Sequence, residues 1–214
     1  HHERSHWLSL RMPWNRIAPP LWFAFLASLI TLLAWITAEP VILGLWEALD
    51  VTGSVWSHWW AADALARGAN PFVGTHSYVP VGLDPVLQYN LLDAIIHAPF
   101  ILLFGPHTGY NLSLAFALMA TGWSAFGVAR AMGQSQGASL FAGTLVQASS
   151  IVLLEAHEGR ISQVTLVFML LALREAAVMT HRGPDVRNGA RLGVFAACSA
   201  LVYWYQGFAL GLGL

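Results

Sequence analysis

The sequence predicts an all-α membrane protein, a polytopic bundle of transmembrane helices with external interfacial helices in its first loop. Apolar residues make up 57% of the 214 residues and charged residues only 10%, and the mean hydropathy is +0.58. A water-soluble domain typically has about 25% charged residues. Long apolar runs alternate with short polar segments. The net charge of -1, without a basic run, gives no sign of a nucleic-acid partner.

The first span is expected at about residues 20–38. Pro19 and Pro20 open an apolar run over 21–37, which is close to the shortest helix that crosses a ~30 Å hydrocarbon layer. Arg4, Arg11 and Arg16 precede this run. Because arginines favour the inner side, the sequence predicts a cytoplasmic N-terminus.

The first external loop is expected over about 47–107 and begins with a tryptophan-rich helix. Between Ser54 and Arg67, tryptophans recur at helical spacing, a pattern typical of a helix lying in the membrane interface. Gly68 is the predicted stop, followed by a turn at Asn70 and Pro71. The wet face of this helix is predicted to carry His58 and Asp63.

A second apolar run in this loop, Leu91 to Phe104, decides the topology. It has only 14 residues and contains Asp93, His97 and Pro99, so we expect it to lie along the outer interface and not to cross. If it crossed, Arg130 and the arginines after residue 180 would face outwards, against the positive-inside rule.

Four further spans are therefore predicted, at about 108–130, 137–155, 161–180 and 190–212. Small residues occupy every fourth position of the second span, which favours close helix packing. These residues are Ser113, Ala117, Thr121, Ala125 and Ala129, with Ser139 and Gly143 repeating the pattern in the third span.

Polar residues that follow two outer span ends are the candidate site. Asp50 comes after the first span, and Glu155, His157, Glu158 and Arg160 come after the third. Ionisable groups at a bilayer surface are costly unless they are hydrated, paired or functional. We therefore expect Asp50 and Glu155 to face one cavity; helix capping and a solvated turn are the simpler alternatives.

The layout resembles the GT-C superfamily of membrane glycosyltransferases. Besides Asp50 and Glu155, the matching elements are the helix ending ARGANPF, the YxPxG turn beginning at Tyr78, and the short helix ending LLFG. One departure is Val51, because an acidic residue commonly stands there in some branches of the superfamily. The resemblance covers the N-terminal part of such enzymes, so we expect a single transmembrane module from a longer chain.

The resemblance implies transfer of a sugar from a polyprenyl-phosphate carrier to a glycan, lipid or protein acceptor at the periplasmic face of a bacterial inner membrane. Asp50 is the candidate general base and Glu155 the second catalytic carboxylate. Mg²⁺ or Mn²⁺ is a possible cofactor, held by Asp50, Glu155 and His157. The residues predicted to contact substrate or its phosphate are His157, Glu158, Arg160, His58 and Tyr78.

Two other functions stay open on sequence alone. A transporter or channel segment would carry ionisable groups along a pathway within the spans, whereas Gln147 is the only strongly polar residue near mid-span here. Arg174 and Glu175 stand nearer an end and can pair with each other. A noncatalytic membrane scaffold would have the same helices.

Overall fold

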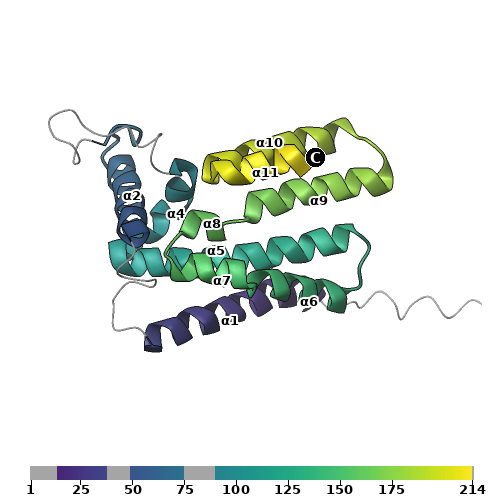
Figure 1. Ribbon diagram of the computed structural model, residues 1–214, viewed down its shortest axis with the longest axis horizontal. Helices are drawn as coiled ribbons and strands as arrows, with labels where there is room; N and C mark the ends of the chain where they lie inside the picture. Colours follow the sequence, from purple (N-terminus) through teal and green to yellow (C-terminus); the bar gives the residue numbers. More distant parts are fainter. Residues whose placement is uncertain (1–13, 38–48, 75–89, 214) are drawn as a thin grey trace, which may run out of the picture.

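The structure, a computed structural model, describes residues 14–37, 49–74 and 90–213; the side chains of 14–17, 33–37, 49, 50 and 91 lie outside that description. Helices form its framework (Figure 1), and no β-strand occurs in the described ranges. The helices are α1 (Trp14–Thr37), α2 (Leu49–Ala66), α4 (Leu91–Phe104), α5 (Pro106–Ala131), α6 (Gln136–Gln147), α7 (Ser150–His157), α8 (Ile161–Val164), α9 (Val167–Arg182), α10 (Val186–Val202) and α11 (Trp204–Gly213).

Three helical stretches are long and apolar enough to cross a membrane among the residues searched. They are Pro106–Ala131, Gln136–His157 and Ile161–Arg182, and they coincide with the predicted second, third and fourth spans. The apolar part of α1 that is described, Ala18–Leu32, is shorter. Helix α1 also begins before Pro19 and Pro20, which lie inside it and do not open it.

Helix α5 occupies the centre, in contact with α1, α4, α6 and α9. Its predicted small-residue face is its buried face: Ser113 and Thr121 are fully buried, and Ala117, Ala125 and Ala129 are nearly so. Gly143 of α6 lies so close to α5 that an added Cβ would sit 2.6 Å from the carbonyl oxygen of Gly122. Small side chains therefore allow the two backbones to approach each other, as predicted.

Two of the long stretches are interrupted, and a polar side chain bonds to backbone groups at each break. Between α8 and α9, the Thr121 hydroxyl donates to the Val164 carbonyl at 2.6 Å and accepts from the Leu166 N–H at 3.1 Å. Between α6 and α7, the Ser149 side chain caps α7 by accepting from the N–H of Val152. Broken helices are tolerated at membrane depth only where such partners exist.

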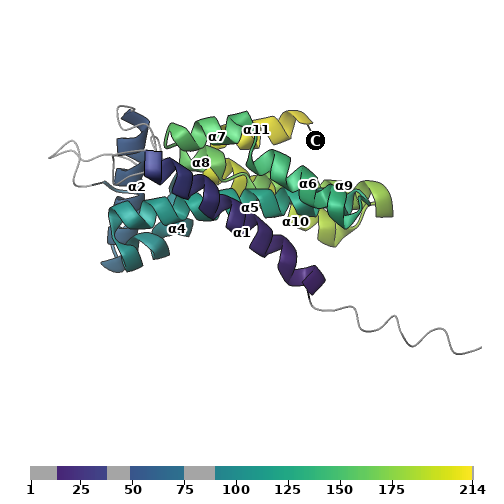
Figure 2. The same cartoon turned by 90° about the horizontal axis from the view of Figure 1, so that it is seen from below.

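The predicted span 190–212 is divided at Tyr203, where the chain folds back and α11 lies against α10 (Figures 1 and 2). A Cβ on Gly207 would lie 2.4 Å from that of Ala200, and the Ser199 hydroxyl donates to the side-chain oxygen of Gln206 at 3.2 Å. Gln206 also donates to the carbonyl of Ser162 at 3.0 Å. One long apolar run thus forms a helical hairpin because its middle residues have partners on another helix.

Helices α2 and α4 lie at one end of the long helices, and Figure 1 shows α2 running across their direction. The run Leu91–Phe104 is a 14-residue helix packed on α2, α5 and α10, and it is not among the three long stretches. Helix α2 ends at Ala66, and an Asx turn at Asn70 follows as predicted, with the N–H of Phe72 donating to the Asn70 side chain. The α5–α6 and α9–α10 turns, with Arg130 and Arg182, lie at the opposite end.

Candidate functional site

The turn between α7 and α8 carries four of the predicted site residues, and its conformation is set by Gly159. The φ of Gly159 is +68°, its N–H donates to Ala156, and the N–H of Arg160 donates to the carbonyl of Glu155. This is the Schellman pattern that ends a helix at a left-handed glycine. The Arg160 guanidinium then pairs with the Glu155 carboxylate at 3.2 Å. His157 is exposed and Glu158 is half-buried at the same turn.

The first turn of α2 reaches this same place. A Cβ on Gly159 would lie 2.3 Å from Cγ2 of Val51, and Val51 is 1% exposed. The Tyr110 hydroxyl of α5 donates to the carbonyl of Gly159 at 2.6 Å, which fixes the turn from a third helix. Asp50 precedes Val51 in α2, so its backbone stands beside the α7–α8 turn. The shared cavity of the Asp50 and Glu155 carboxyl groups stays a prediction, because the Asp50 side chain is outside the described part.

Two open grooves border this junction. One, of about 510 Å³, is lined by Glu155 and Gln163 together with apolar side chains of α6, α7, α9 and α11. The other, of about 370 Å³, is lined by Val51, Trp56 and Trp59 and by the start of α5. Tyr78, the remaining predicted substrate contact, lies outside the described residues.

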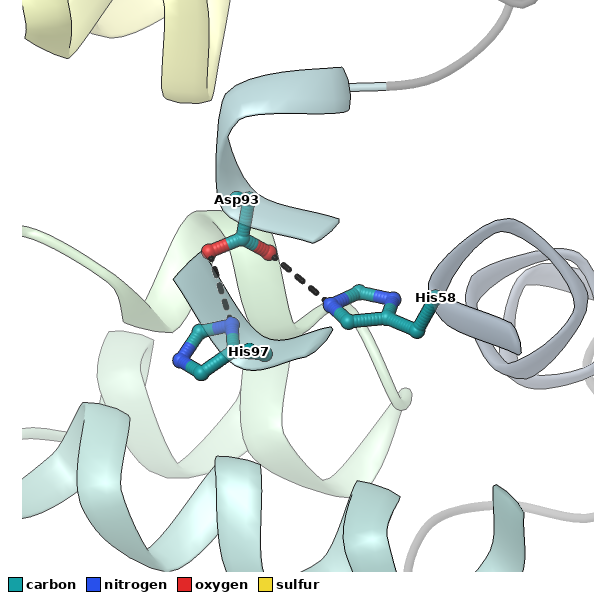
Figure 3. Close-up of side chains that lie close together, drawn as sticks. All are labelled: His58, Asp93 and His97. Carbon is teal, nitrogen blue, oxygen red and sulfur yellow. Dashed lines mark ion pairs between the residues drawn. The ribbon is translucent and has the colours of Figure 1, made fainter. Parts of the chain in front are cut away.

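His58 is not where the sequence placed it. Its side chain is 3% exposed, so the prediction of a wet-face residue is wrong, whereas Asp63 is partly exposed and pairs with Arg67. His58 points from α2 towards Asp93 and His97 of α4 (Figure 3). The reason is that α4 covers the face of α2 that carries His58, and both α4 residues are fully buried.

These three side chains form a compact cluster. His58 Nε2 lies 3.4 Å from Asp93 Oδ2, and His97 Nδ1 lies 3.3 Å from Asp93 Oδ1. Burial raises the pKa of Asp93, but the two histidines lower it more, so the pKa of this carboxyl falls well below its usual value. The carboxylate form is therefore the stable one. None of the facing atoms makes a hydrogen bond of normal geometry within the described residues.

In the sequence, Asp93 and His97 indicate only that the run 91–104 does not cross. Their spacing of four residues puts both on one helix face. An ionisable pair on an otherwise apolar helix is the sequence feature that could have indicated a site here. The partner on α2 could not be chosen from the sequence, because His58 is one of nine histidines. Only the packing of α2 on α4 selects it.

Comparison with known proteins identifies no relative: no family model, no curated protein and no solved structure matches the chain.

Proposed function

We propose that the chain is the N-terminal membrane module of a glycosyltransferase that moves a sugar from a polyprenyl-phosphate carrier to an acceptor hydroxyl at the external face. The observation that carries this proposal is the contact of Val51 with Gly159. It joins the α2 turn that carries Asp50 to the turn that carries Glu155 and Arg160. The candidate base Asp50 and the candidate phosphate-binding residue Arg160 therefore belong to neighbouring turns.

The 510 Å³ groove supports a lipid-linked donor. Its walls are mainly apolar, with Leu145, Ile151 and Met169 among them, and Glu155 lies at its α7 side. Such a groove suits a polyprenyl chain, whose phosphate would then lie near the polar turn. Exposed Trp204 and Tyr205, stacked at 3.7 Å on the start of α11, extend the aromatic surface beside it.

In the proposed reaction, the acceptor hydroxyl attacks the anomeric carbon while Asp50 accepts its proton. The bond between that carbon and the phosphate oxygen breaks, and the polyprenyl phosphate leaves with the electron pair. Arg160, held by Glu155, stabilises the developing negative charge. Mg²⁺ or Mn²⁺ bound by Asp50, Glu155 and His157 stays a further prediction.

The test uses the full-length protein in liposomes with radiolabelled polyprenyl-phosphate hexoses and pentoses. Asp50→Asn should lower transfer by about 10²–10⁴-fold, because the amide cannot accept the proton. Asp63→Asn is the matched control on the same helix and should keep wild-type transfer. Near-normal transfer by Asp50→Asn would refute the base assignment. A wild-type protein that transfers none of these sugars would refute the function.

A further inference from the structure

We propose that His58, Asp93 and His97 bind a divalent transition-metal ion, Zn²⁺ in the first instance, that fastens helix α2 to helix α4. This site is separate from the Asp50 and Glu155 region and does not depend on sugar transfer. The donor atoms of the three side chains all lie within 4.8 Å of one another. All three residues are at least nine-tenths buried and point at a common centre (Figure 3).

Two nitrogen–oxygen separations are longer than in a hydrogen-bonded ion pair and match the spacing of ligands around one ion. Zn–N and Zn–O bonds of ~2.0–2.2 Å at tetrahedral angles place neighbouring ligand atoms roughly 3.3–3.5 Å apart. The two nitrogen–oxygen distances in the cluster are 3.4 Å to Oδ2 and 3.3 Å to Oδ1 of Asp93, and the three donor atoms lie within 4.8 Å of one another. A charged N–H to carboxylate hydrogen bond would bring the same atoms to about 2.7–2.9 Å.

The hydrogen bond made by the other ring nitrogen of His58 also supports a metal site. His58 Nδ1 lies 2.7 Å from the carbonyl oxygen of Ser54, and a carbonyl can only accept, so Nδ1 carries a hydrogen. Nε2 is then the ring nitrogen left to bind an ion beside the Asp93 carboxylate, whose Oδ2 lies 3.4 Å away. An imidazole that donates its second N–H to a backbone carbonyl is the usual arrangement of a metal-bound histidine.

The donor set selects the class of metal. Two imidazoles and one carboxylate suit zinc and the neighbouring divalent transition metals, whereas Mg²⁺ and Ca²⁺ prefer oxygen ligands. No thiolate is involved, because Cys198 is the only cysteine and lies on α10. Three protein ligands leave the fourth tetrahedral position for water or another donor.

Aromatic rings enclose the proposed site. The ring of Tyr110 stands edge-on to His58 at 5.9 Å, and that of Phe116 stands edge-on to His97 at 6.1 Å between ring centroids. The Tyr110 hydroxyl is occupied by Gly159, so this ring contributes an apolar wall. One ligand comes from α2 and two come from α4. Binding therefore links the two helices across the chain segment that separates them.

The experiment begins with the wild-type full-length protein in detergent, stripped with EDTA, re-equilibrated with micromolar ZnCl₂ and freed of excess metal. We expect one zinc per chain by mass spectrometry of the metal. The zinc X-ray absorption spectrum should show nitrogen and oxygen neighbours at ~2.0–2.1 Å, imidazole scattering and no sulfur. Zinc should also raise the unfolding temperature. A wild-type protein without zinc above the buffer blank, or with sulfur ligands, would overturn the proposal.

The variants then assign the ligands. His97→Ala and Asp93→Asn should each weaken zinc binding by at least about 100-fold. Loss of a residue that only supports a ligand costs up to about 100-fold in metal affinity, and loss of a ligand itself should cost no less. His107→Ala removes an exposed histidine at the start of the adjoining helix α5 and should keep the full zinc content. Zinc retained by His97→Ala, or lost from His107→Ala, would overturn the assignment.

Discussion

The two ends of the helical unit use the same turn for different purposes. Gly159 ends α7 and Gly133 follows α5, both with positive φ and with the same pair of backbone hydrogen bonds. At Gly133 an added Cβ would meet nothing within 4 Å, whereas at Gly159 it would meet Val51 at 2.3 Å. The Gly133 turn ends a helix, and the Gly159 turn also supports the layer formed by α2 and α4. A local motif thus acquires a tertiary role only where a second element lies on it.

The two ends also differ in how their charged residues are placed. At the Gly133 end, arginines are exposed or pair locally, as Arg130 does with the carbonyl of Gln134. At the other end, Asp93 and two histidines are buried between helices. Arginines at a membrane boundary indicate which end faces the cytoplasm, since they favour the inner side. Buried ionisable groups indicate a candidate binding site, because their burial is costly without a partner.

The largest expected effect is on chemical accessibility from opposite sides of the membrane. In a chain whose Cys198 is replaced by serine, Glu158→Cys should react with a membrane-impermeant thiol reagent added outside intact cells. Gly183→Cys, at the arginine end, should react only after the membrane is opened. Labelling at position 183 and not at 158 would reverse the predicted orientation and remove the external site.

Substitution of the two turn glycines should differ in cost. Gly133→Ala should lower the free energy of unfolding by about 1–2 kcal/mol, because alanine is strained at positive φ. Gly159→Ala should cost about 1–3 kcal/mol more, because its Cβ also collides with Val51. Unfolding in detergent, followed by circular dichroism, measures both. An equal loss of unfolding free energy in the two variants would mean that Val51 of α2 does not pack against the Gly159 turn.

A smaller effect is expected at the break between α8 and α9. Thr121→Val keeps the shape of the side chain but removes the hydroxyl that bridges the Val164 carbonyl and the Leu166 N–H. These two groups then keep only their own hydrogen bond of 2.9 Å, so the expected cost is about 1–2 kcal/mol. Thr180→Val is the matched control, since that hydroxyl donates only within α9 to Ala176. Its effect on the unfolding free energy should be close to zero. Similar values for the two variants would contradict the bridging role of Thr121.

The smallest effect should come from the exposed ion pair on α2. Arg67→Ala removes the partner of Asp63, and both side chains are in contact with solvent. Surface pairs contribute about 0.2–1 kcal/mol, so the unfolding temperature should fall only slightly. Arg67 also lies over the Trp60 ring, 5.5 Å from its centroid, so Arg67→Lys is the control that retains a cation. A loss as large as that of Gly159→Ala would show that this helix is held chiefly by surface charge.

The sequence by itself determined the features that depend on composition and periodicity. The three long stretches were predictable because apolar length alone sets what can cross a bilayer. The buried face of α5 was predictable because Ser113, Ala117 and Thr121 repeat every fourth residue and small side chains allow close helix approach. The short helix over 91–104 and the turn at Asn70 follow from equally local rules.

Only the tertiary structure decided which distant residues meet. His58 has a helical position that suits a wet face, and it is buried because α4 covers it. The hairpin at Tyr203 forms inside an apolar run that satisfies the rule for one span, because Gln206 finds partners in Ser162 and Ser199. Periodicity specifies the face of a helix, but the element that covers that face is selected by packing between segments far apart in the chain.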